Sequence, residues 1–106
     1  MAKALSVIND YEFVSDLDKD EEIKTKWILR SLTGREFLRC VQNGIVDHEL
    51  IINYGLIGWK DFPDEDGKDI EFNLANIDRI PSEYLAEISF KLQEMAQLQD
   101  DEIKNS

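Results

Sequence analysis

Apolar and polar residues near the start of the chain form short runs compatible with β-strands, and around Glu12 they alternate with the two-residue period of a half-buried strand. Leu5–Ile8 and Tyr11–Val14 are two such runs, and Lys26–Arg30 is a third. In the third run Trp27 and Leu29 fall on one face, and aromatic and aliphatic residues of this kind favour a pleated surface. These runs predict a small antiparallel sheet in the N-terminal part of the chain.

A helix is predicted to begin after Thr33. The hydroxyl of Thr33 can accept a hydrogen bond from the third helical residue, and the carboxylate of Glu36 can reach back to the backbone N–H of Thr33. Apolar positions continue this helix to about Gln42. The sequence then places its end at Asn43-Gly44, since both residues tolerate the left-handed conformation of a helix C-terminus.

A second helix is predicted from about Val46 to Trp59, and it is apolar on most of its sides. Such a helix must be covered on more than one face, either by the chain's own elements or by a second subunit. We therefore predict a partner-binding surface on this helix and the loop after it, formed by Ile51, Tyr54, Trp59 and Phe62. The alternative is that Trp59 and Phe62 pack against the last helix as ordinary core.

The second half of the chain carries clear turn and capping signals. Asp66-Gly67 predicts a turn, with a short hairpin around it. Asn73 can cap a short helix over Leu74–Ile80, which Pro81 ends.

The last helix is predicted from Pro81 or Ser82 to about Leu98. Its core-facing stripe follows steps of three and four residues: Leu85, Ile88, Leu92 and Met95. The whole pattern predicts one α+β domain over residues 1–106, with frayed ends at 1–3 and 100–106. It has a small N-terminal antiparallel sheet or hairpin, three to four helices and a mainly helical C-terminal part.

Charge narrows the classes of partner. The chain has 12 Lys and Arg against 23 Asp and Glu, a formal net charge of −11. Such a surface repels phosphate backbones and anionic lipid headgroups, so we expect neither nucleic acid nor a membrane as the partner. The sequence has no apolar run of about 20 residues and no signal-peptide layout at its start, which predicts a cytoplasmic protein.

Candidate catalytic and metal-binding groups are sparse. Cys40 and His48 are the single cysteine and the single histidine, and a nucleophile pair would need them in contact with a third, orienting group. Asp16, Asp18 and Asp20 have the spacing that opens a calcium loop. The glycine and bidentate glutamate that such a loop needs further on are absent from it. We therefore expect no catalytic residue, no cofactor and no metal site.

Several separated segments resemble one family of small phage proteins. They are Trp27–Glu36, Gly55–Phe62, Asp66-Gly67, Glu71-Phe72 and Asn76–Pro81. The family pattern reads W-x-L-R-x-L-T-G-R-E before the first helix, then Gly-Leu-x-Gly-Trp, an Asp-Gly turn, and Arg-[Leu/Ile]-Pro before a final amphipathic helix. This pattern is similar to that of tail assembly chaperones of long-tailed bacteriophages and prophages. The likeness covers about Trp27 to Met95 and does not extend to residues 1–24.

The resemblance implies a protein that binds the phage tape measure protein, or other tail proteins, during virion assembly in the bacterial cytoplasm. Proteins of this family are usually absent from the finished particle, and some self-associate, so a homo-oligomer is compatible with it. The resemblance implies no catalytic residue. Two alternatives stay open: a structural tail or connector component of the virion, and an acidic inhibitor that mimics nucleic acid to block a host protein.

Overall fold

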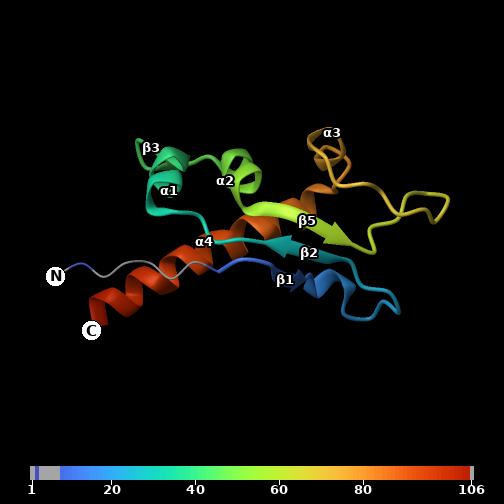
Figure 1. Ribbon diagram of the computed structural model, residues 1–106, viewed down its shortest axis with the longest axis horizontal. Helices are drawn as coiled ribbons and strands as arrows, with labels where there is room; N and C mark the ends of the chain where they lie inside the picture. The colour runs from blue at the N-terminus through green and yellow to red at the C-terminus, as the bar shows by residue number, and fades with distance from the viewer. Residues whose placement is uncertain (1, 3–7, 106) are drawn as a thin grey trace.

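Strand β2 (Lys26–Leu29) is the centre of an antiparallel sheet with the strand order β1-β2-β5 (Figure 1). The computed structural model describes residues 2 and 8–105, with side chains as far as residue 96. Strand β1 (Tyr11–Val14) pairs along one edge of β2 and β5 (Leu56–Lys60) along the other. The predicted small antiparallel sheet is thus confirmed, whereas residues 5–7 of the first predicted run lie outside the described residues.

Burial alternates along β2 as its sequence predicts. Trp27 and Leu29 are buried and Lys26 and Ile28 are half-buried. Trp27 lies opposite Phe13 on β1 and opposite Trp59 on β5, so these aromatic residues share the inner face of the sheet. The acidic segment between β1 and β2 contains a single 3₁₀ turn at Asp16–Asp18.

Helix α1 (Gly34–Cys40) begins with the predicted capping box. The backbone N–H of Glu36 donates to Thr33 Oγ1 at 3.1 Å, and that of Thr33 donates to Glu36 Oε1 at 2.9 Å. The predicted helix end at Asn43-Gly44 is wrong.

Asn43 and Gly44 instead form the turn between β3 (Val41–Gln42) and β4 (Ile45–Val46). Their φ angles are 54° and 76°, the left-handed values that a two-residue hairpin turn requires.

The segment predicted as one long apolar helix is a helix followed by a strand. Helix α2 (His48–Gly55) ends where β5 begins. The backbone N–H of Arg30 donates to the carbonyl oxygen of Gly55 at 2.9 Å, and β5 continues this pairing with β2. The apolar residues from Leu56 onward therefore lie in a sheet and not around a helix. The prediction that an all-round apolar helix needs extra cover rested on the wrong element.

The loop after β5 is built around Asp64 and Gly67. Asp64 Oδ1 accepts the backbone N–H groups of Asp66 and Lys68 at 2.9 and 3.0 Å, and Gly67 has a φ of +80°. A β-bridge between Pro63 and Asp69 makes this segment the predicted short hairpin.

Helix α3 (Leu74–Ile77) follows with its predicted cap, because Asn73 Oδ1 accepts the N–H of Asn76 at 2.8 Å. Helix α3 is shorter than predicted. The residues up to Ile80 continue as turns, in which Arg79 and Ile80 donate to the carbonyls of Asn76 and Ile77.

Helix α4 (Ser82–Asn105) crosses the inner face of the sheet and packs against α2 (Figure 1). It continues beyond the predicted end at Leu98 and through most of the segment predicted to fray. Its predicted stripe is confirmed, since Ile88, Leu92 and Met95 are buried and Leu85 is half-buried.

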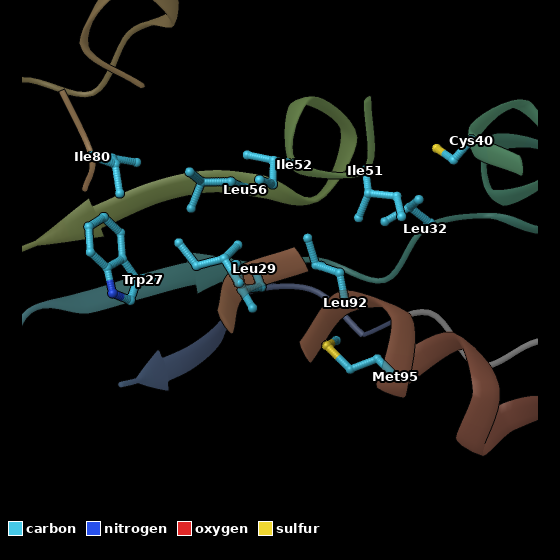
Figure 2. Close-up of a cluster of buried hydrophobic side chains, with 11 residues drawn as sticks. Trp27, Leu29, Leu32, Cys40, Ile51, Ile52, Leu56, Ile80, Leu92 and Met95 are labelled. Carbon is cyan, nitrogen blue, oxygen red and sulfur yellow. The ribbon is translucent and has the colours of Figure 1, made fainter. Parts of the chain in front are cut away.

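The core lies between the sheet, α2 and α4. Figure 2 shows side chains from β2, β5, α2 and α4 pointing toward one another, with Leu29 and Leu92 near the middle and Cys40 of α1 at one end. The protein is an α+β fold in which α4 joins the sheet to the helices. Over the residues described, none of the helices combines the length and the apolar character that crossing a membrane requires.

Candidate functional site

The four residues predicted to bind a partner occupy different environments. Ile51 is fully buried, at 0% exposure, and belongs to the core. Tyr54, Trp59 and Phe62 are half-buried and pack against that core. Ile51 therefore faces the protein interior in this structure and presents no surface to a partner. Its inclusion in the predicted surface depended on α2 being apolar on all sides, which it is not.

Trp59 and Phe62 lie together in an aromatic cluster. Their ring centroids are 5.1 Å apart, and each packs against Trp27, at 6.1 and 5.1 Å. Phe72 and Tyr84 complete the cluster, 4.8 Å from Trp59 and 5.9 Å from Trp27 respectively. The indole N–H of Trp59 donates to the carbonyl oxygen of Ile70 at 2.7 Å, which fixes the ring. This cluster joins the sheet to the loop and to α4, so its first role is packing.

Cys40 and His48 lie in different surroundings. Cys40 is buried, and burial raises the pKa of its thiol, which disfavours the nucleophilic thiolate. His48 lies at the start of α2, with its Nδ1 atom 2.6 Å from Ser89 Oγ of α4. Gln93 adds its amide at 3.3 Å from the same hydroxyl. His48 is thus part of a polar contact between two helices.

Carboxylates of the two acidic segments take part in hydrogen bonds within the fold. Asp64 orders its own turn, as described above. Asp18 accepts hydrogen bonds from the Tyr84 hydroxyl at 2.6 Å and from the Thr25 backbone N–H at 3.1 Å. Among the described side chains, no three of His, Cys, Asp or Glu are grouped closely enough to hold a metal ion.

An open groove with a volume of about 850 Å³ lies between α2, α3 and α4. Helix α2 contributes Ile52 and Asn53 to its lining, and α4 contributes Leu85, Ala86 and Phe90. Each wall follows from helical spacing, because residues three or four apart lie on the same side of a helix, as Glu49 and Asn53 do on α2 and Ala86 and Phe90 do on α4. The groove thus lies between one side of α2 and one side of α4.

The short helix α3 forms the third wall with Leu74 and Ile77. Leu74 is 75% exposed and Phe90 is 63% exposed, although both are large apolar side chains. Ile52 is buried and Ile77 half-buried, so the apolar surface runs from a covered floor to an open rim. Large apolar side chains gathered at the rim of a groove are typical of a site that contacts another molecule.

The charges at the groove are of one sign. Glu49 of α2 and Asp78 at the end of α3 line it, and neither lysine nor arginine is among its lining residues. His48 also lines the groove, with its ring 5.8 Å from that of Phe90 in an edge-to-face contact. The groove therefore offers apolar surface beside carboxylates, a combination suited to an amphipathic partner with positive charge.

The surface predicted from the sequence did not include Phe90 and Leu74, which line this groove. Phe90 lies on α4 outside the core stripe, which leaves a large aromatic residue on the outer face of a helix that already has its core face. Leu74 is the first residue of a short helix that is flanked by the polar residues Asn73 and Asp78. The sequence does show that Phe90 is apolar and lies outside the core stripe of α4. That Phe90 lies beside α2 follows only from the tertiary structure.

Comparison with protein-family models, with curated proteins and with solved structures gave no significant match.

Proposed function

We propose that the chain is a tail assembly chaperone of a long-tailed bacteriophage or prophage. It acts in the cytoplasm of the bacterial host by binding the tape measure protein, without catalysis. The observation that carries the proposal is the open apolar groove between α2, α3 and α4, with Phe90 and Leu74 exposed at its rim.

The resemblance supports the phage context through segments that meet in space. Trp27–Glu36 includes β2 and the start of α1, and Gly55–Phe62 includes β5. These two segments are paired strands, with Trp27 opposite Trp59. Asn76–Pro81 leads into α4, which covers the same sheet. The resembling residues thus define the framework, and the groove lies along its helical side.

Co-expression tests the proposal. We expect the tape measure protein from the genome that encodes this chain to stay soluble and to co-purify with it, and to aggregate when expressed alone. A double variant, Leu74→Ser with Phe90→Ser, is expected to abolish both effects. The matched control is Leu38→Ser with Ile45→Ser, at apolar positions that are 74% and 73% exposed and lie outside the groove lining.

Two results would contradict the proposal. One is a tape measure protein that gains nothing in solubility from the wild-type chain. The other is the chain itself found as a stoichiometric component of purified virions, which would assign it to the tail or connector structure.

A further inference from the structure

Resting on the proposed function, a more specific inference concerns the chemistry of the segment that binds in the groove. We propose that the groove receives an amphipathic α-helix of the partner protein, which carries lysine or arginine residues beside its apolar stripe. The apolar stripe contacts Leu85, Ile77 and Phe90, and the basic residues meet Glu49 and Asp78.

The lining of the groove favours a helix over an extended strand. Its lining residues come from α2, α3 and α4 and the residue that ends α3, and none comes from a strand. An extended peptide placed there would leave its own backbone N–H and C=O groups without partners against apolar side chains, which costs free energy. A helix satisfies its backbone internally and presents side chains at the spacing that fits between two other helices.

The size and openness of the groove favour a macromolecular segment over a small ligand. Its volume of about 850 Å³ is at the upper end for a small-molecule pocket. The apolar surface also continues onto the rim, where Leu74 and Phe90 are 75% and 63% exposed. A small ligand on the floor would leave those two side chains in water, whereas a helix lying along the groove would cover them.

The carboxylates that line the groove favour basic residues beside the apolar stripe of the bound helix. Glu49 and Asp78 are exposed carboxylates on two different walls, and the lining includes no cationic side chain of Lys or Arg. A docked helix with acidic or purely apolar flanks would desolvate these carboxylates without pairing them, which is unfavourable. A helix with basic flanks pairs them, and the net charge of −11 on the whole chain accelerates its approach.

Two synthetic peptides test this inference on the full-length protein. Each has about 15 residues, or about four helical turns, and carries the same leucine stripe. One has lysine at the flanking positions and the other has glutamate. Binding is measured by the fluorescence anisotropy of labelled peptide at a fixed ionic strength. We expect the lysine peptide to bind at least about tenfold more tightly than the glutamate peptide.

Variants place the binding and its charge preference in the groove. Leu74→Ser is expected to weaken binding of the lysine peptide. Leu38→Ser, at an equally exposed leucine of α1, is expected to leave that binding unchanged. Glu49→Lys with Asp78→Lys is expected to reverse the preference between the peptides. Glu65→Lys with Asp66→Lys changes the net charge equally, but on the loop after β5, and is expected to keep the preference.

The outcomes separate this inference from the proposed function. Equal affinity for the two peptides, binding of neither, or a reversal caused equally by the loop variant would overturn the basic-helix inference. The tape measure co-expression result could still stand in that case. Conversely, a lysine-peptide preference that depends on Glu49 and Asp78, together with a tape measure protein that does not bind, would keep the helix site and reject the proposed function.

Discussion

Tyr84, near the start of α4, donates its hydroxyl to Asp18 Oδ1 at 2.6 Å, across 66 positions of sequence. Asp18 is only 6% exposed, and its other carboxylate oxygen accepts the backbone N–H of Thr25. The acidic segment before β2 is therefore tied to the last helix by one of its own carboxylates. Because Asp18 is buried and Tyr84 is half-buried, this contact is expected to contribute more to stability than a fully exposed pair would.

Removing the Tyr84 hydroxyl should measure that contribution. Tyr84→Phe is expected to lower the free energy of unfolding by about 1–2 kcal/mol, because it leaves a buried carboxylate oxygen without its donor. Urea denaturation followed by tryptophan fluorescence gives the value. Tyr11→Phe, at an exposed position of β1, is the control and should change the midpoint little. An unchanged midpoint for Tyr84→Phe would show that water replaces the hydroxyl at no cost.

The same contact predicts a change at alkaline pH. The hydrogen bond to Asp18, with burial, raises the pKa of Tyr84 from 10.0 to about 12. A raised folded-state pKa means that the contribution is fully present below pH 10 and is lost as the pH rises from about 10 to about 12. We expect ultraviolet titration to show one tyrosine that ionises late, and Tyr84→Phe to remove that late step. A titration with no step near pH 12 would contradict the contact.

Glu36 and Arg30 predict how stability responds to acid. Two guanidinium N–H groups of Arg30 donate to the two carboxylate oxygens of Glu36 at 2.9 and 2.7 Å. This pairing, helped by the backbone N–H of Thr33, lowers the pKa of Glu36 from 4.5 to about 2. A lowered folded-state pKa means that the contribution is present above about pH 4.5 and is lost as the pH falls toward 2.

Arg30→Met is therefore expected to lower the free energy of unfolding by about 1–2 kcal/mol at pH 7. The difference from wild type should shrink as the pH falls toward 2. Urea unfolding at several pH values measures this. Lys60→Met breaks the exposed pair with Glu12, which solvent screens, and should change stability little at any pH. A constant difference for Arg30→Met across the acid range would mean that lost packing, and not charge, causes the effect.

Gly55 is expected to tolerate no side chain. A Cβ atom there would lie 2.5 Å from both terminal methyl groups of Leu92, which is itself buried in the core. Gly55→Ala should therefore destabilise the protein by about 1–3 kcal/mol through overpacking between α2 and α4. Thermal or urea unfolding tests this.

Gly58→Ala is the matched control, because a Cβ atom there would meet Ile28 at an ordinary 3.7 Å. The double variant Gly55→Ala with Leu92→Ala should lose less free energy of unfolding than the two single variants lose in sum, since the smaller side chain at position 92 relieves the clash. Strict additivity would show that Leu92 is not the obstacle.

The exposed residues of the groove should be dispensable for folding. Phe90→Ser and Leu74→Ser are expected to change the free energy of unfolding by no more than about 0.5 kcal/mol, since both side chains are largely in water. Leu92→Ala on the same helix as Phe90 is buried and is expected to cost about 2–5 kcal/mol. A large loss of stability for Phe90→Ser would identify it as core and remove it from the proposed binding surface.

Features that depend on neighbours along the chain were predictable from the sequence. The capping box at Thr33 and Glu36, the buried face of β2 with Trp27 and Leu29, the Asp-Gly turn and the stripe on α4 all follow from local hydrogen bonding or from a repeat of two or 3.6 residues. Each was predicted with the right residues, because the physical cause and the signal lie within one short segment.

The ambiguous apolar and turn segments take their form from contacts between elements that are distant in sequence. The run from Val46 to Trp59 has no period that separates helix from strand, and its last part, from Leu56, is a strand because β2 offers it a partner. Asn43-Gly44 suits a helix end and a hairpin turn equally, and pairing of β3 with β4 selects the turn. The groove belongs to the same class of feature, since its walls come from three helices separated in sequence. Its existence depends on how α2 and α4 pack, a relation that no local pattern encodes.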